Sequence, residues 1–394
     1  MTIVRPAVGP EAAAVPGAPC TLGDLLGYFL RLGALGFGGP IALVGYMQRD
    51  LVDERGWVSQ QDYLEGLALA QLAPGPLAAQ LAIYLGWVRA GVTGATLVSV
   101  AFILPSFLMV LALSALYLRY GGLSWMQGVF YGVGAAVIAI IGRSAAKLVR
   151  MTLGQDRLLW TLFGVSALVT AWTESEVVWL FVLCGVVGLA VRGVLGRPAA
   201  VLGLVPLWLV AGLHGPADGA TLGRVFWYFA EAGAFVFGSG LAIVPFLYGG
   251  VVNTFHWLTE RQFLDAVAVA MITPGPVVIT VAFIGYLVAG PLGAALAALG
   301  VFLPCYLFVI IPASHFRRAV HDRRLRAFVD GVTAAATGAI AGAAFVLGRR
   351  AIVDVPTALI ALGTLAVLVR GSKIPEPLVF VAAGGVGLAL RGTF

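Results

Sequence analysis

A Pro-Gly-Pro triplet interrupts an apolar run at two places in this chain. Pro74-Gly75-Pro76 lies near the middle of the run from Tyr63 to Val88, and Pro274-Gly275-Pro276 near the middle of the run from Phe263 to Val288. Each run is long enough to cross a bilayer, which takes roughly 20 apolar residues as a helix. Because proline removes a backbone donor and clashes with the preceding turn, each triplet frees backbone N–H and C=O groups. Freed groups are tolerated at membrane depth only where protein or a watery cavity surrounds them, so the paired breaks predict a transport site.

The composition is typical of a polytopic membrane protein. Of the 394 residues, 60% are hydrophobic and 11% are charged, which is far too apolar for a soluble protein of this length. The formal charge of +6 comes from Lys and Arg clusters between apolar runs, as in loops that set membrane topology. We therefore expect a multi-pass membrane protein that binds no nucleic acid. Residues 1–21 contain no basic start followed by an apolar core, and we expect a flexible cytoplasmic tail there.

The two halves of the chain align with each other. At a shift of 200 residues Phe37 matches Phe237, and the two Pro-Gly-Pro triplets coincide. One residue is then lost, and a shift of 199 matches Leu104-Pro105 with Leu303-Pro304. The near-constant offset predicts a tandem duplication. Its expected parts are a first transporter repeat at 22–193, a linker with one membrane segment at 194–223, and a second transporter repeat at 224–394.

Loop charge predicts that the two copies face opposite ways. In the first copy a basic loop with Arg143 and Arg150 follows the fourth apolar segment, whereas in the second a basic cluster from Arg317 to Arg326 precedes it. Basic loops stay on the cytoplasmic side. We therefore predict an all-α polytopic membrane protein whose homologous halves form an inverted-topology repeat with discontinuous helices. The expected count is about 13 membrane segments, with roughly 10 to 14 left open, and it falls if the broken segments are re-entrant hairpins.

Four backbone breaks are candidates for a binding site: Phe37–Pro40, Pro74–Pro76, Phe237–Gly240 and Pro274–Pro276. If inverted symmetry brings them together, helix N-termini with exposed N–H groups converge on one point and favour an anion. The alternative is that these glycines and prolines only kink helices for close packing. The candidate substrate-binding residues form the breaks or flank them: Phe37, Gly38, Gly39, Pro40, Gln71, Pro74, Gly75, Pro76, Gln80, Gly238, Ser239, Gly240, Thr273, Pro274, Gly275, Pro276 and Thr280.

Two pairs of ionisable residues lie within apolar runs, where charge is costly and commonly functional. Arg31 and Glu231 are equivalent in the two copies. In a functional interpretation Arg31 attracts an anion and Glu231 carries a coupling proton; the alternative is a structural ion pair or snorkelling near the membrane surface. Glu65 and Asp265 are also equivalent, and for them we expect compensation of a helix dipole.

Enzyme and metal motifs are missing from the sequence. Cys20, Cys184 and Cys305 lie far apart without CxxC spacing and are interpreted as free thiols. The four histidines show no metal-ligand spacing, and no nucleophile or nucleotide-binding motif occurs. We predict that the chain is not an enzyme, has no catalytic residues, and uses neither metal nor cofactor.

These motifs carry a family resemblance. Phe37-Gly38-Gly39-Pro40, with the later residues Trp57, Gln71, Pro74-Gly75-Pro76, Gln80 and Leu104-Pro105, resembles the N-terminal half of the chromate ion transporter family in its long, two-domain form of chromate efflux proteins. The stretch Phe237-Gly238-Ser239-Gly240, with Pro245, the second triplet and Leu303-Pro304, is similar to its C-terminal half. The resemblance implies export of chromate from a prokaryotic cytoplasm across the inner (plasma) membrane, with sulfate as the chemically similar anion. Many members have a His shortly after the Phe-Gly-Gly-Pro motif, where this chain has Ala42-Leu43.

We therefore predict a secondary transporter that exports chromate by alternating access, coupled to an ion gradient or working by exchange. Transport of another oxyanion such as sulfate, and an anion channel of the same architecture, are the alternatives left open. The expected partners are the chromate or sulfate-like anion and the lipid bilayer, and the sequence leaves a homodimer open.

Overall fold

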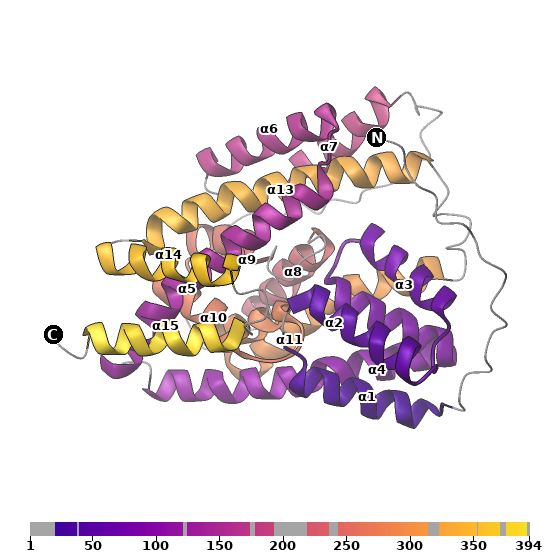
Figure 1. Cartoon of the computed structure of the whole chain (residues 1–394), viewed down its shortest axis with the longest axis horizontal. Helices are drawn as coiled ribbons and strands as arrows, with labels where there is room; N and C mark the ends of the chain where they lie inside the picture. The colour runs from indigo at the N-terminus through magenta and orange to yellow at the C-terminus, as the bar shows by residue number, and fades with distance from the viewer. Residues whose placement is uncertain are drawn as a thin grey trace.

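The computed structural model describes residues 20–37, 39–120, 124–173, 178–192, 219–235, 243–313, 323–352, 354–370 and 376–391, where helices joined by turns form the whole fold (Figure 1). The first half contains α1 (Leu22–Leu35), α2 (Gly39–Met47), the π-helical η1 (Gln48–Glu54), α3 (Gln60–Leu72), α4 (Leu77–Tyr120), α5 (Ser124–Thr152), α6 (Arg157–Thr173) and α7 (Val178–Val191). The second half contains α8 (Gly219–Phe235), α9 (Ile243–Tyr248), η3 (Gly249–Thr254), α10 (Glu260–Ile272), η4 (Val277–Ile279), α11 (Thr280–Ala313), α13 (Arg323–Ala351), α14 (Val355–Arg370) and α15 (Glu376–Arg391).

Several helices suit a bilayer. Among the described residues, four helices are long and apolar enough to cross it: Leu77–Tyr120, Met126–Arg143, Val277–Ala313 and Ala327–Arg349. Their surfaces and those of the shorter apolar helices expose large side chains, such as Leu168 at 73% and Val381 at 71%. Lipid solvates such side chains, whereas water would not. The prediction of a multi-pass α-helical membrane protein is confirmed. Its segment count stays a prediction, as do the tail at 1–21 and the linker at 194–223, which lie almost wholly outside the described residues.

The longest helix, α4, contains a reversal of chain direction. Ala90 and Gly91 have non-helical torsions and divide it. A Cβ atom added to Gly86 would lie 2.6 Å from the carbonyl oxygen of Gly94, and one on Gly94 would lie 2.2 Å from that of Gly86. In a straight helix these residues would be about 12 Å apart along the axis, so the chain must fold back between them. The equivalent residues of α11 repeat the reversal: Gly285, Ala289, Gly290 and Gly293.

The Pro-Gly-Pro triplet of the first half lies at the tip of a helical hairpin. α3 leads into it and the first part of α4 leads away. Gly66 and Tyr84 stand equally far before and after Gly75, and a Cβ atom on Gly66 would lie 2.4 Å from Cδ1 of Tyr84. Residues at equal distances from a break touch only when the two legs run antiparallel. The run from Tyr63 to Val88 is therefore a hairpin of two antiparallel legs and not one straight interrupted helix.

The break after α1 is the tip of a second hairpin. The hydroxyl of Tyr28 on α1 donates to Asp50 on η1 over 3.2 Å, so α1 runs antiparallel to α2 and η1. The second half repeats this arrangement, because Tyr228 on α8 donates to the carbonyl oxygen of Phe246 on α9 over 3.2 Å. The first half thus begins with two helical hairpins, and in the second half α8 packs on α9 in the corresponding way.

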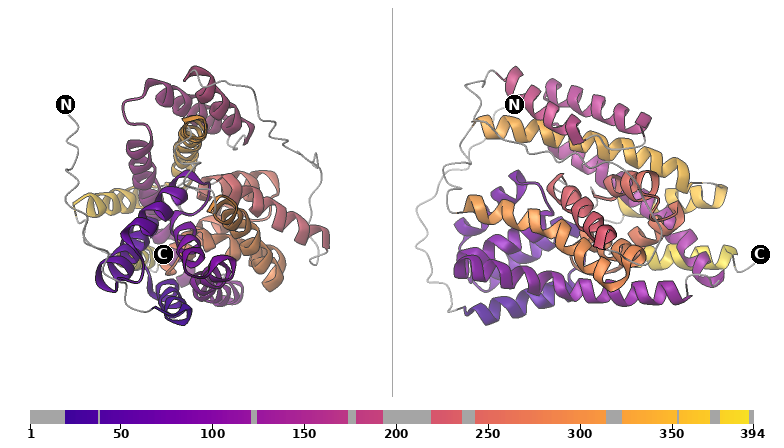
Figure 2. Two further views of the ribbon diagram at one scale, coloured as in Figure 1. Left: turned by 90° about the vertical axis from the view of Figure 1, so that its right-hand side faces the viewer. Right: turned by 180° about the vertical axis from the view of Figure 1, so that it is seen from behind.

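The later helices of each half pack on the other half. α5 lies against α14 and α15, and α13 lies against α6 and α7 (Figures 1 and 2). Glycines bring these backbones close: a Cβ atom on Gly132 of α5 would lie 1.9 Å from the carbonyl oxygen of Ala383, and one on Gly338 of α13 would lie 2.3 Å from that of Phe163. Small residues at helix crossings allow close packing in membranes. α5 and α13 therefore each pack on helices of the other half and hold the two halves together.

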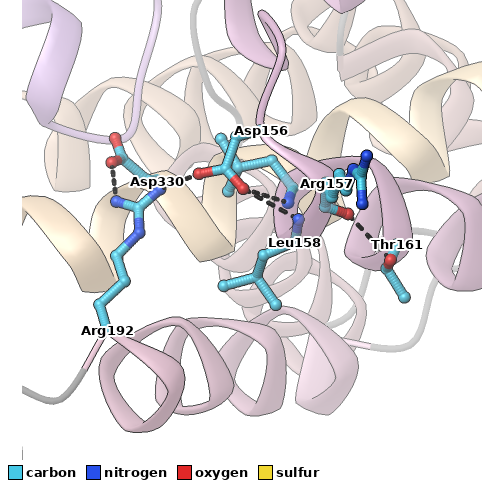
Figure 3. Close-up of polar contacts among 7 residues, drawn as sticks. Asp156, Arg157, Leu158, Thr161, Arg192 and Asp330 are labelled. Carbon is cyan, nitrogen blue, oxygen red and sulfur yellow. Dashed lines mark hydrogen bonds and ion pairs between the residues drawn. The ribbon is translucent and has the colours of Figure 1, made fainter.

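Arg192 forms two salt bridges, one of them to the other half, where α6 and α7 pack on α13 (Figure 3). Arg192, directly after α7, donates to Asp156 over 2.8 Å and to Asp330 of α13. Asp156 also accepts from the backbone amide of Leu158 and so caps α6. Burial acts to raise the pKa of the Asp156 carboxyl, but its hydrogen bonds from Arg192 and from backbone amides outweigh burial and hold the pKa below the ordinary value.

Because the legs of the first Pro-Gly-Pro hairpin are antiparallel, we expect both of its ends to lie on the same side of the membrane. Ser59, before α3, and Arg89, at the end of the second leg, are both exposed. In a chain whose buried native cysteines are replaced by alanine, we expect Ser59→Cys and Arg89→Cys to react with a membrane-impermeant maleimide from the same side of the membrane. Detergent-solubilised protein, in which both sites should react, is the control. Labelling from opposite sides would mean that α3 and the first part of α4 form a straight span.

The salt bridges of Arg192 predict that removing this side chain lowers stability by an amount that depends on pH. We expect Arg192→Ala to lower the free energy of unfolding by about 1 kcal/mol, since the pairs are partly exposed. Arg157→Ala, at an exposed neighbour, should change it by less than about 0.5 kcal/mol. Because folding lowers the pKa of Asp156, its contribution is full above the ordinary value of 3.8 and is lost as the pH falls through the folded value. Thermal unfolding of both variants between pH 7 and pH 3 would measure this; equal losses at every pH would contradict it.

Candidate functional site

The tip of the first hairpin of one half meets the tip of the second hairpin of the other half. The backbone N–H of Gly275 donates to the carbonyl oxygen of Gly36 over 2.8 Å. This bond joins the second Pro-Gly-Pro triplet to the residue directly before Phe37. Two of the four predicted breaks are therefore in direct contact, although they come from opposite halves of the chain.

Each Pro-Gly-Pro tip also packs against a long helix of the other half. A Cβ atom on Gly275 would lie 1.9 Å from Oγ of Ser106 on α4, and one on Gly75 would lie 2.9 Å from Sγ of Cys305 on α11. Ser106 and Cys305 are equivalent, since each follows a Leu-Pro pair. The contacts are reciprocal, as in a two-fold arrangement. Glycine is favoured at both tips because Gly75 has φ +136° and Gly275 has φ +96°, torsions that other residues adopt only with strain.

Ser106 and Cys305 also contact the first helix of their own half. The Ser106 hydroxyl donates to the carbonyl oxygen of Gly33 over 3.0 Å, and Sγ of Cys305 lies 3.7 Å from that of Gly233. Through Ser106, Gly275 lies near the C-terminal end of α1. Through Cys305, Gly75 lies near the C-terminal end of α8. Sequence reasoning missed both residues, because a serine and a cysteine at equivalent positions give no sign of a shared role.

Gln80 and Thr280 follow the two triplets and are fully buried. Nε2 of Gln80 donates to the carbonyl oxygen of Pro74 over 2.6 Å, and the Thr280 hydroxyl donates to that of Val277 over 2.8 Å. Each side chain therefore ties the outgoing leg to its own tip. Oε1 of Gln80 has no partner among the residues that the structure describes. A buried acceptor without a donor costs about 1 to 3 kcal/mol, and this oxygen would accept from a donor but not from an anion.

The tips offer backbone donors to an anion. α4 begins at Leu77, and Gln80 is the first residue whose amide is paired within it, donating to Pro76 over 3.0 Å. The amides of residues 77–79 precede that bond and have no intrahelical partner. Together with the positive end of the helix dipole they favour negative charge. The described residues contain no group of three or more His, Cys, Asp or Glu side chains that could hold a metal ion.

The other predicted site residues differ in burial. Thr273 is buried, and its hydroxyl is satisfied within α10 by the carbonyl oxygen of Val269 at 2.7 Å. Gln71 is exposed at the end of α3, while Phe37 and Pro40 are half-buried. The triplets themselves are buried apart from the half-buried Pro74. Gly39 begins α2. Gly38, Gly238, Ser239 and Gly240 lie outside the described residues.

Arg31 and Glu231 are both exposed, on α1 and α8. Arg31 lies opposite the buried face of its helix, which carries Phe29 and Gly33 toward α4. The structure therefore does not bring these two side chains into the tip junction. Their role in charge attraction or coupling stays a prediction.

One polar contact between the halves was not predicted. The hydroxyl of Tyr117 on α4 donates to Oδ2 of Asp265 on α10 over 2.7 Å. Asp265 is 5% exposed and lies beyond the first turn of α10. Compensation of the helix dipole, the expected role, acts within the first turn and does not account for a buried carboxylate at this position.

The close contact between Gly275 and Ser106 predicts what a methyl group added at Gly275 does to stability. We expect Gly275→Ala to destabilise the protein by about 2 to 4 kcal/mol, because the new methyl group meets Ser106 and the backbone is strained. Gly290→Ala is the matched control: its φ is +64° but nothing lies within 4 Å, so only the backbone cost of about 1 to 2 kcal/mol applies. Adding Ser106→Ala should recover part of the loss at Gly275. Equal thermal stability of the two single variants would contradict this packing.

Comparison with known proteins agrees with this architecture. The chain matches the family described as chromate transporter over residues 23–189 and 223–388. It is 58% identical to the chromate transport protein of Cupriavidus metallidurans, over 96% of this chain and 95% of that protein. It is 56% identical to the probable chromate transport protein of Synechococcus elongatus, over 93% and 95%, and 32% identical to the chromate transport protein of Pseudomonas aeruginosa, over 97% and 96%.

No solved structure gives a significant match. The relatives are named as transport proteins, in agreement with the prediction that the chain is not an enzyme. The two matched regions contain the paired hairpins whose tips meet at Gly36 and Gly275. The resemblance noted in the sequence is confirmed, and the chain belongs to the chromate transporter family.

Proposed function

We propose that this protein is a secondary transporter that exports chromate from the cytoplasm across the inner membrane by alternating access. The observation that carries the proposal is the hydrogen bond between Gly275 and Gly36, because it joins interrupted helices from both halves. Discontinuous helices that meet at a repeat interface form the substrate sites of many transporters. The named relatives support chromate as the substrate.

The chemistry of the tips fits a tetrahedral dianion. Chromate cannot cross hydrocarbon unaided, since a buried charge without partners is prohibitively costly. Amides at the start of α4 offer hydrogen bonds and a positive dipole without a fixed cation. Such a site holds a dianion and still releases it. Sulfate has the same shape and charge, so we expect it to compete.

We further infer that the two halves are inserted in opposite orientations. The loop charges support this, and so do the reciprocal contacts of Gly75 with Cys305 and of Gly275 with Ser106. In inverted repeats one conformation of the first half corresponds to the opposite conformation of the second, which gives alternating access. The sequence contains no nucleotide-binding motif, so coupling to an ion gradient or exchange supplies the energy. The homodimer is not part of this proposal.

Chromate transport by purified protein tests the proposal. In liposomes we expect uptake that requires the protein, and about tenfold to a hundredfold slower uptake by Pro74→Ala and Pro274→Ala, because misplacing a site by about 1 Å has effects of this size. Pro356→Ala is the control, since Pro356 lies in the first turn of α14, where a proline needs no amide partner. An absence of chromate uptake by the wild type, or full activity of both triplet variants, would refute the proposal.

A further inference from the structure

Asp265 is a buried carboxylate that the tip junction does not use. It is 5% exposed, and among the described residues it forms no ion pair with a lysine or arginine. Its one hydrogen bond in the described part of the chain comes from the hydroxyl of Tyr117. Keeping a carboxylate charged in such surroundings is costly, and intramembrane acids of this kind commonly bind protons.

Tyr117 belongs to the first half but contacts both legs of the second half's hairpin. Its hydroxyl is bonded to Asp265 on α10, the leading leg, over 2.7 Å. Its ring packs edge-on against Phe283, on the first part of α11, with 5.3 Å between ring centres. Phe130 of α5 contacts the ring from another helix of the first half, at 5.7 Å. Tyr117 therefore connects the first half to the hairpin that carries Gly275 at its tip.

The residues equivalent to Asp265 and Tyr117 differ from them. Glu65, equivalent to Asp265, is half-exposed and accepts from Gln61 over 3.0 Å and from Tyr84 over 3.4 Å, both within its own hairpin. Phe316, equivalent to Tyr117 at a shift of 199, has no hydroxyl. Asp265 is buried and bonded across the halves, so a change in charge at Asp265 acts on the contact between them.

Few other charges act on Asp265. Arg261, which lies one turn earlier on α10 and is exposed, is the cation that acts on it. α10 also packs on α5, α9, α11, α15 and the neighbouring short helices. Among the described residues of these elements no further titratable group acts on the carboxylate, and Tyr248 of α9 faces the ring of Phe263 instead. Tyr117 is thus its main polar partner.

We propose that Asp265 is the proton-binding site that couples transport to a pH gradient, with Tyr117 as the positioning residue that transmits its charge state to the first half. This inference rests on the proposed transport function. A proton from the aqueous phase adds to a carboxylate oxygen, an O–H bond forms, and the negative charge is removed. Hydrogen bonds to an ionised group are roughly twice as strong as neutral ones, so protonation loosens the contact between α4 and α10. Loss of the proton on the other side restores it.

Asp265→Asn is the central test, because asparagine keeps the size and the acceptor for Tyr117 but cannot take up the proton. In liposomes we expect wild-type chromate uptake to be stimulated by a pH gradient. In the variant we expect that stimulation to be lost while chromate exchange at equal pH continues. Glu65→Gln is the matched control and should keep the stimulation. Glu231→Gln tests the other candidate carrier and should also keep it.

The pH profile of Tyr117→Phe is a second test, and it does not depend on Asp265→Asn being folded. It removes only the hydroxyl that stabilises the carboxylate, so we expect the pH profile of chromate transport to move toward higher pH. A purely structural role would lower the rate without moving the profile.

The outcomes separate the two proposals. Chromate transport that is stimulated equally in wild type and Asp265→Asn would overturn this inference and leave the transport function intact. An unmoved profile in Tyr117→Phe, or loss of stimulation in Glu231→Gln with Asp265→Asn unaffected, would also overturn it. Wild-type transport without any response to a pH gradient would refute proton coupling itself, and no chromate transport at all would refute the proposed function.

Discussion

Backbone groups freed where a helix stops inside a membrane protein must find partners within the protein, and in this chain one such bond joins the two halves. The Gly275 amide is satisfied by Gly36 of the other half. The carbonyl oxygens of Gly33 and Pro74 are satisfied within the first half, by the Ser106 hydroxyl and by Nε2 of Gln80. Because lipid offers no hydrogen bonds, the Gly275 amide keeps its partner only while the halves are assembled. The second Pro-Gly-Pro tip therefore depends on the first half.

Two kinds of contact join the halves. The later helices, with α5 against α14 and α15 and α13 against α6 and α7, bring backbones into contact at glycines such as Gly132 and Gly338. The hairpins meet through the hydrogen bond of Gly275 with Gly36 and through the packing of the two tips on Ser106 and Cys305.

Sequence alone predicted the duplication, which a shift of 200 residues makes visible. It also predicted the breaks and the membrane class, which follow from local composition. It could not decide between a straight span and a hairpin, since the run from Tyr63 to Val88 has a length that suits both. The contact of Gly66 with Tyr84 decides it. Asp265 was assigned to helix-dipole compensation because its partner, Tyr117, is distant in sequence and lies in the other half. Burial and pairing across copies are tertiary facts without a local signal.

The meeting of the tips is tested most directly by one new cysteine. A Cβ atom at Gly75 would lie 2.9 Å from Sγ of the native Cys305, close to the separation found in a disulfide. We predict that Gly75→Cys forms a disulfide with Cys305 under mild oxidation, and that the two halves stay covalently joined after cleavage at a protease site inserted at 194–218. Separate halves with both thiols free to react would show that the tip of one half does not touch the other.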